Sequence, residues 1–388
     1  MQRWLVVFVV LVAVVAYGQR GAGDQNPPFG QGELEVEATV PPEDATTAKQ
    51  DPIAALEKLG AKIKRGDDGK PVLINLNETL IDDASLAHLT GLTSLTRLNL
   101  RRTKITDAGL THITGLTKLE QLFLPGTRVT DAGLANLKGL NNLKELGLAA
   151  TRISDAGLMQ LAGLTQLETL FLDSTQVSDT GLVHLKGLTS LTRLYLSKTR
   201  VGDKGLKHLQ GLAKLELLYL PRTRVTDAGL ANLKGLNNLK ELGLATTQIQ
   251  GHGLANLTGL TKLQTLYLNH SGVGDQGLFH LKRLTSLRAL FLHDTFVSDN
   301  GLEHLKGLQK LQRLYLPRTR VTDVGLVHLE GLTQLKELGL EATLVSDDGL
   351  SSLSGLARLT TLYLGSTLVS ETGLGAIKKR LPQCRILH

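Results

Sequence analysis

The stretch LYLPRTRVTDAGLANLKGLNNLKELGL, residues 218–244, decides the fold of this chain. Residues 122–148 repeat it, and 25 of the 27 positions are identical. Each copy places leucines first in the alternating order LxL and then at the spacing of a helix. A near-copy 96 residues away indicates that the chain is built from repeated units, so the repeat length has to be established before domains are counted.

The underlying unit is 24 residues long and reads LxxLxxLxLxxTxVxDxGLxxLxG. It starts at Leu92 and recurs without insertion or deletion to residue 379, and a degenerate unit precedes it from Asp68. The range 68–379 therefore holds thirteen repeats of 24 residues. Units that share LTSL, LP or LKELGL group the last twelve into three blocks of four, at 92–187, 188–283 and 284–379.

The two halves of a unit predict a short strand and a short helix. Alternation in LxL places the leucines on one face of a strand and the residue between them on the other. The half DxGLxxLxG has leucines at helical spacing behind an N-capping residue. Neither element can bury its leucines alone, so the units must stack. Strands stack more closely than helices, which predicts an α/β solenoid with parallel strands on the concave side and helices on the convex side.

The motif LxxLxLxxT-x-V resembles the leucine-rich-repeat consensus, with threonine where asparagine is usual. The V-T-D-x-G-L centre is similar to a family of secreted bacterial leucine-rich-repeat proteins and, more distantly, to the repeats of F-box adaptors. The resemblance covers residues 68–388. It implies a curved horseshoe and a binding role, and it names no ligand.

The ends of the chain predict export and capping. Residues 1–18 have the basic, apolar and small-residue order of a secretory signal peptide, with a retained anchor as the alternative. Residues 19–52 form an acidic, flexible linker of net charge −5, and the remaining 53–388 carry +11. Residues 53–67 are expected to form an N-terminal capping helix and 380–388 a C-terminal cap. We expect a secreted, periplasmic or cell-surface monomer without stable membrane insertion after cleavage.

The residue between the strand leucines forms the most informative column, because it faces the concave side. Eight of the ten aromatic residues after Gln50 stand in this column. Stacking that stiffens the sheet is one interpretation, and a ligand-binding strip is the other. The column reads Asn75, Asn99, Phe123, Gly147, Phe171, Tyr195, Tyr219, Gly243, Tyr267, Phe291, Tyr315, Gly339 and Tyr363.

In each block a glycine separates two aromatic residues of this column, which predicts an open slot roughly 10 Å wide between rings two strands apart. A glutamate two residues before the glycine and a basic residue of the preceding unit would border each slot. The glutamates are Glu145, Glu241 and Glu337, and the arginines are Arg128, Arg224 and Arg320. Together with the aromatic column they predict a site for a protein or polysaccharide ligand, which could be acidic or repetitive.

Three other columns are interpreted as structural. Threonines after each strand are expected to bind backbone groups of the next unit, and aspartates before each helix to cap it. Helix histidines are expected to line the convex face, too far apart to share a metal ion; they are His88, His112, His184, His208, His280, His304 and His328.

Uniform units without loop insertions leave no place for converging catalytic groups, so we expect neither an enzyme nor a bound metal or cofactor. The signal sequence and the lack of a nucleic-acid motif argue against a nucleic-acid partner. The sequence favours an exported, non-catalytic recognition scaffold. A ubiquitin-ligase-type substrate adaptor and a structural envelope protein without a specific ligand are the alternatives.

Overall fold

A computed structural model describes residues 51–388, and residues 50–388 group as one compact unit. The predicted signal peptide and all of the acidic linker except its last two residues lie outside the described residues. No helix within residues 51–388 combines the length and apolarity needed to cross a bilayer.

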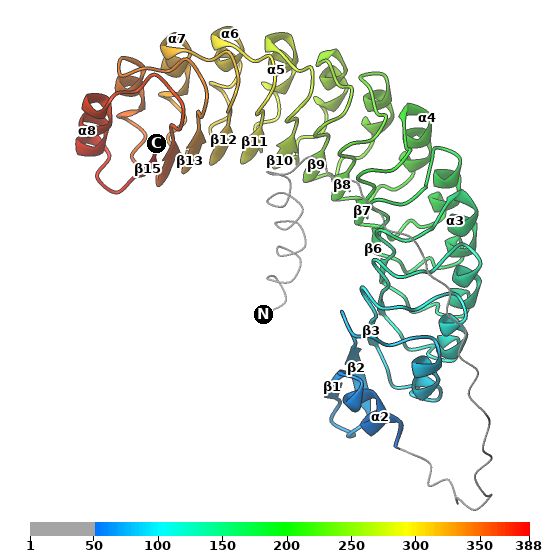
Figure 1. Ribbon diagram of the computed structural model, residues 1–388. Helices are drawn as coiled ribbons and strands as arrows, with labels where there is room; N and C mark the ends of the chain where they lie inside the picture. The colour runs from blue at the N-terminus through cyan, green and yellow to red at the C-terminus, as the bar shows by residue number, and fades with distance from the viewer. Residues whose placement is uncertain (1–50) are drawn as a thin grey trace, which may run out of the picture. The chain divides into compact units, whose positions relative to one another are not determined.

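One sheet of 15 strands runs through the described unit in sequence order, and strands line its inner side (Figure 1). Strands β2 to β15 pair in parallel, each with the strand of the next repeat. Their bounds are β2 (Pro71–Asn75), β3 (Arg97–Asn99), β4 (Gln121–Phe123), β5 (Glu145–Gly147), β6 (Thr169–Phe171), β7 (Arg193–Tyr195), β8 (Leu217–Tyr219), β9 (Glu241–Gly243), β10 (Thr265–Tyr267), β11 (Ala289–Phe291), β12 (Arg313–Tyr315), β13 (Glu337–Gly339), β14 (Thr361–Tyr363) and β15 (Arg385–Leu387).

Each repeat strand from β3 to β14 is three residues long and buries its central leucine completely. The first and third residues face the concave side, as the alternation of LxL predicts. The register between neighbouring strands never slips from β2 to β14, so equivalent residues of all repeats form straight rows. This register fixes which side chains meet on the concave face.

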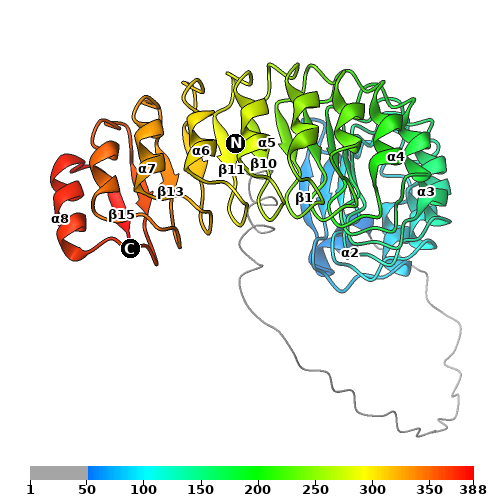
Figure 2. The same ribbon diagram turned by 90° about the horizontal axis from the view of Figure 1, so that it is seen from above.

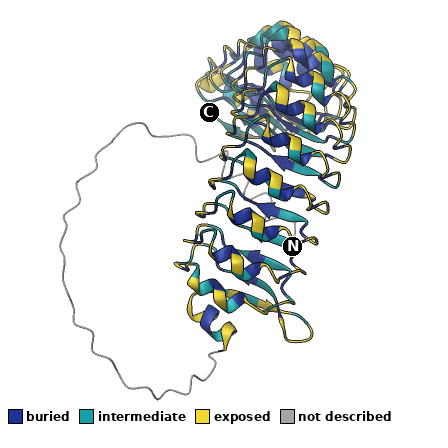
Figure 3. Ribbon diagram, turned by 90° about the vertical axis from the view of Figure 1, so that its right-hand side faces the viewer, coloured by how far each residue is buried: buried dark blue, intermediate teal, exposed yellow. Residues whose placement is uncertain are grey.

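Short helices cover the outer side of the sheet, as Figures 1 and 2 show from two directions. The α-helices are α3 (Asp155–Leu161), α4 (Asp203–Leu206), α5 (Asp275–Leu281), α6 (Asp299–Glu303), α7 (Asp323–Leu326) and α8 (Glu371–Arg380). The other repeats have 3₁₀ turns, namely η1 (Ala84–Leu89), η2 (Gly109–Ile113), η3 (Gly133–Leu137), η4 (Gly181–Leu185), η6 (Gly229–Leu233), η7 (His252–Leu257) and η9 (Gly349–Leu353). Two further 3₁₀ turns, η5 (Lys207–Leu209) and η8 (Val327–Leu329), directly follow α4 and α7. Segments of this length permit only one or two turns, which suits the tighter helix. Figure 3 shows the buried residues between the two layers and the exposed ones on the outer turns.

The expected capping helix over 53–67 is wrong in its extent. Helix α2 (Pro52–Lys58) begins after Asp51, whose side chain accepts a hydrogen bond from the Ile53 N–H at 3.0 Å. The helix ends because Gly60 has a φ of +92°, a left-handed conformation that stops helices. The chain then forms β1 (Lys62–Arg65), which pairs with β2 in the antiparallel direction. The basic residues of β1 protect this outer edge of the sheet.

The aspartate column joins neighbouring repeats instead of capping its own helix. Asp131 accepts a hydrogen bond from the Ser154 N–H at 2.7 Å and another from the Ser154 hydroxyl at 2.5 Å, 23 residues further on. The same pair of bonds links Asp107 to Thr130 and Asp323 to Ser346. The expectation of a cap was incorrect, because the carboxylate meets two donors of the next repeat at once.

The threonine column does the opposite of what was expected, since its hydroxyls bind within their own repeat. The Thr103 hydroxyl donates to the Leu100 carbonyl at 2.7 Å, and Thr223 donates to Leu220 at the same distance. The residue before each threonine adopts a positive φ, such as 53° at Ala150 and 57° at Arg222. The left-handed residue turns the chain back at the end of the strand, and this brings the threonine hydroxyl to the carbonyl three residues earlier.

Candidate ligand-binding face

The predicted aromatic column lies on the concave face, at the third position of each strand. Parallel register places Phe171 beside Tyr195, Tyr195 beside Tyr219, and Tyr267 beside Phe291. Phe291 in turn lies beside Tyr315. Most of these rings are half-buried, whereas Tyr195 retains only 4% of its exposure.

The rings stack on one another along the sheet. Ring centroids lie 4.6 Å apart for Phe171 and Tyr195, 4.5 Å for Tyr267 and Phe291, and 5.0 Å for Phe291 and Tyr315, with nearly parallel planes. Tyr195 and Tyr219 are tilted at 5.5 Å. Offset stacking of this kind adds about 0.5–1.5 kcal/mol per pair beyond buried area. We call the seven rings from Phe171 to Tyr363 the aromatic ladder; they are Phe171, Tyr195, Tyr219, Tyr267, Phe291, Tyr315 and Tyr363.

The predicted open slots at the glycines are wrong, because the preceding aromatic ring covers each glycine. The Tyr219 ring leans over Gly243 and meets Tyr267 at a centroid distance of 5.5 Å. The Tyr315 ring likewise crosses Gly339 to Tyr363 at 6.0 Å. A Cβ built on Gly243 would lie 3.0 Å from Cδ1 of Tyr219. The glycines therefore make room for a neighbouring ring of this chain and leave no gap.

At Gly147 the preceding ring also covers the glycine, since a Cβ there would lie 3.0 Å from Cδ1 of Phe123. Phe123 instead has the Arg97 guanidinium 5.4 Å from its ring centroid. Within the described residues no ring contact joins Phe123 to Phe171. The aromatic ladder therefore begins at Phe171.

The three glutamates of the predicted site have different surroundings. Glu145 forms an ion pair with Arg193 at 3.2 Å, two strands away. Glu337 accepts a short hydrogen bond from the Tyr315 hydroxyl. Within residues 51–388 no hydrogen bond or ion pair reaches the carboxylate of Glu241. Burial raises the pKa of Glu241, and the positive charge of Arg313 opposes that rise.

The tyrosine hydroxyls around Glu241 are held in their neutral form. Burial raises the pKa of Tyr219 and of Tyr195, and the charge of Glu241 raises both further. The Tyr195 hydroxyl is buried and has no hydrogen-bond partner within the described chain. Such an orphan polar atom lowers stability unless another molecule supplies the partner.

The structure does not bring the predicted arginines to the aromatic ladder. Arg128, Arg224 and Arg320 are exposed and lie beyond the strand ends, where the Arg224 N–H donates to the Val201 carbonyl at 2.8 Å. Arg320 lies over Phe296, 5.1 Å from the ring centroid. Among the strands that carry the aromatic ladder, β6 to β14, the cations at the first strand position are Arg193 and Arg313. Sequence reasoning missed both, although the two-residue alternation that selected Glu145 also places them on the concave face.

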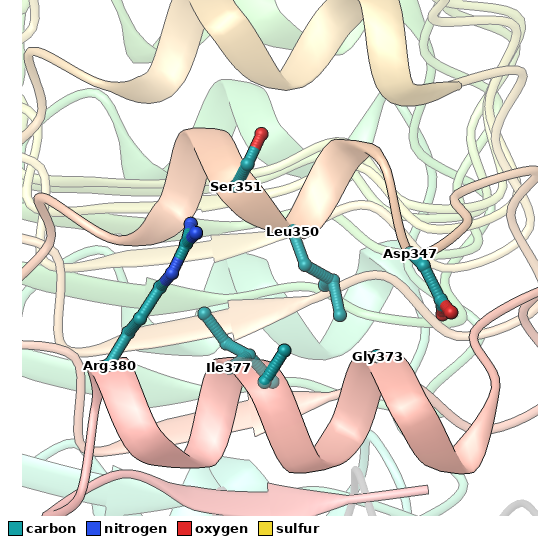
Figure 4. A pocket seen from close by; sticks show the side chains of 7 residues that line it. Asp347, Leu350, Ser351, Gly373, Ile377 and Arg380 are labelled. Atoms are coloured by element: carbon teal, nitrogen blue, oxygen red, sulfur yellow. The ribbon is translucent and has the colours of Figure 1, made fainter.

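Outside the concave face, residues 51–388 offer no comparable site. Figure 4 shows a pocket between η9 and α8, lined by Asp347, Leu350, Ser351, Ile377 and Arg380 among others. The Asp347 carboxylate there already accepts bonds from the Ser370 N–H and hydroxyl. No group of three or more His, Cys, Asp or Glu that could hold a metal ion occurs in the described part of the chain.

Comparison with known proteins identifies the repeats. The family model described as "Leucine Rich repeat" matches residues 91–113, 187–209 and 259–281. The fold is a leucine-rich-repeat solenoid. This confirms the fold class predicted from the sequence. Among curated protein sequences, none matches this chain.

Several solved leucine-rich-repeat structures share this solenoid. An internalin, InlF, from Listeria monocytogenes superposes with a TM-score of 0.68 at 24% identity, over 87% of this chain and 93% of its own. A leucine-rich-repeat protein from Leptospira interrogans gives 0.56 at 18%, over 79% and 88%. The ectodomain of the Arabidopsis receptor kinase HAESA, in complex with an IDA peptide hormone, gives 0.58 at 17%, over 87% and 62%. At such identities these similarities establish the fold alone.

Proposed function

We propose that this protein is an exported, non-catalytic recognition scaffold that binds a protein ligand on its concave face. The observation that carries the proposal is the aromatic ladder, a row of rings set on a rigid sheet and interrupted only by glycines. Rigid aromatic side chains supply large contact area at low entropic cost, and they dominate binding energy in protein interfaces. The other face of the sheet is filled with leucines and covered by helices, so it has no free surface to offer.

A protein ligand is preferred to a polysaccharide for a specific reason. The similar HAESA solenoid was solved with a peptide hormone. The concave face presents the aromatic ladder beside the unpartnered carboxylate of Glu241. This combination suits a partner that offers both apolar groups and hydrogen-bond donors. A polysaccharide remains the second ligand class, because sugar rings also stack on aromatic faces. Export is inferred from residues 1–18 and their secretory pattern.

The test is capture of binding partners with the chain from residue 19 onward, run beside a glycan array. The informative variant is Tyr267→Ser with Phe291→Ser, which removes two stacked rings without touching a leucine of the core. Met159→Ser on α3 serves as the matched control, because this convex methionine is 54% exposed. A partner lost by the concave variant and kept by the control supports the proposal. Equal capture by all three proteins would favour a structural role without a ligand on this face.

Export has its own measurement. N-terminal sequencing of the protein recovered outside the cytoplasm should begin near Gln19. Recovery of a chain that still contains Trp4 would show a retained anchor instead.

A further inference from the structure

Glu241 differs from its two counterparts in the repeated blocks, and this difference points to a specific occupant. Glu145 and Glu337 stand at the same position of their blocks but already have partners in Arg193 and Tyr315. Glu241 has neither, although all three belong to the same ELG strand sequence. A half-buried carboxylate without a partner carries a desolvation cost, so its place in the middle of the concave face needs an explanation.

The register around Glu241 excludes a cation from its own strand neighbours. It pairs with Leu217 on one side and Thr265 on the other. Arg313 stands three strands away and is exposed. Arg193 is engaged by Glu145 at 3.2 Å and by the Thr169 hydroxyl at 2.8 Å. The charge of Arg313 therefore acts on Glu241 without an ion pair, and the nearest side chains on the neighbouring strands include tyrosines.

Tyrosine rings frame this carboxylate. Gly243, two residues further on the same face, is covered by the Tyr219 ring, which meets the Tyr267 ring at 5.5 Å. The charge of Glu241 acts on the hydroxyls of Tyr195, Tyr219 and Tyr267. Tyr195 adds an independent sign of an absent partner, because its hydroxyl is orphaned while the residue is only 4% exposed.

We infer that Glu241, Tyr195, Tyr219 and Tyr267 form a subsite for a cationic side chain of the protein ligand, an arginine guanidinium. This rests on the proposed function, since it names what the concave face would take from its partner. A guanidinium can pair with the carboxylate and lie against the tyrosine rings beside it. The charges complement each other, and the ligand supplies the partner that the Glu241 carboxylate lacks.

The two counterpart positions cannot act in the same way. The chain itself supplies the guanidinium of Arg193 to Glu145. At Glu337 the Tyr315 hydroxyl already donates a hydrogen bond to the carboxylate. Only the middle block is therefore free to take a cation from outside. The structure contains within itself an example of the proposed interaction, since the Arg193–Glu145 pair joins a guanidinium and this glutamate position across two strands.

The experiment uses the full chain labelled with 3-fluorotyrosine, because the sequence has only six tyrosines and single Tyr→Phe variants assign their ¹⁹F signals. The probes are N-acetyl-arginine amide and the neutral N-acetyl-citrulline amide. We expect the arginine probe to shift the signals of Tyr219 and Tyr267 saturably and the citrulline probe to leave them in place. Glu241→Gln should weaken the response about tenfold, as expected for losing a charged hydrogen-bonded pair.

The matched controls are Glu145→Gln and Glu337→Gln, which should leave the response of Tyr219 and Tyr267 to the arginine probe unchanged. Equal responses to both probes, or an intact response in Glu241→Gln, would overturn the subsite. That result is distinct from failure of the proposed function, because ligand capture by the concave face would persist without a role for Glu241. Loss of capture, conversely, would not alter the response to the small probe.

Discussion

The ring of Tyr219 lies over Gly243 and reaches Tyr267 two strands away, with ring centroids 5.5 Å apart. A side chain at residue 243 would stand where the Tyr219 ring lies. The glycine that recurs every 96 residues thus has a packing reason, since at each recurrence the preceding ring covers it. The repetition preserves the packing of an aromatic ring over a glycine on the next strand.

Gly243→Leu should displace the Tyr219 ring and break its contact with Tyr267. Because the new side chain overpacks a well-filled surface, we expect a loss of about 1–3 kcal/mol of unfolding free energy and weaker capture of a concave ligand. Urea denaturation measures the loss of stability, and the ¹⁹F signal of Tyr267 reports whether its contact with the Tyr219 ring is lost. Gly211→Ala is the control, because a Cβ there meets no atom within 4 Å. Full stability in Gly243→Leu would contradict the described packing.

Asp131→Ala should weaken the joint between two repeats. Its carboxylate accepts from both the N–H and the hydroxyl of Ser154, and the substitution leaves these donors without their partner. A cost of about 1–3 kcal/mol is expected for such a loss. Hydrogen exchange should show the Ser154 amide losing protection. If the aspartate only capped its own helix, protection would fall at residues 133–135 and Ser154 would be unaffected.

The aspartate row also predicts a dependence of stability on pH. Burial would raise the pKa of Asp155, but hydrogen bonds from the hydroxyls of Ser178 and Thr180 and from the Ser178 N–H outweigh it and hold the pKa below the ordinary 3.8. Because the folded-state pKa is lowered, this stabilisation is present above pH 3.8 and is lost as the pH falls through the folded-state value.

Thermal unfolding of the chain between pH 7 and pH 2 tests this. The midpoint should hold near neutrality and drop in the acid range, and Asp155→Asn should flatten the drop. An identical acid profile for the wild type and Asp155→Asn would show that Asp155 does not contribute to it.

Ala150→Gly should stabilise the protein. Ala150 has a φ of 53°, whereas the equivalent residue of the preceding repeat is Gly126 with a φ of 69°. The left-handed conformation costs an alanine about 1–2 kcal/mol, and the greater freedom of glycine in the unfolded chain cancels about 0.5–1 kcal/mol of the gain. A rise in the denaturation midpoint is expected. Ala149→Gly, next to it and without a positive φ, should lower the midpoint instead.

The sequence by itself determined the repeat length, the alternation of strand and helix, and the face on which each residue lies. These follow from local rules, because side chains alternate along a strand and recur every 3.6 residues along a helix. Because the 24-residue period has no insertion or deletion, the same positions have the same orientation in every repeat. The aromatic column and the buried leucines were therefore predicted correctly. The helix end near Gly60 was not, since a single left-handed residue decides it and β1 then finds a partner in β2.

Only the tertiary structure decided where the side chains point once they are on the concave face. The same strand sequence, ELG, gives an ion pair at Glu145, a hydrogen bond at Glu337 and an unpartnered carboxylate at Glu241. The rings of Phe123, Tyr219 and Tyr315 close the predicted slots, and the aspartates bind the next repeat. Each outcome depends on residues 22 to 48 positions away in the chain, which adjacent strands bring within contact distance. The spacing of residues within one repeat does not identify those partners. They are set by how the side chains of neighbouring repeats pack.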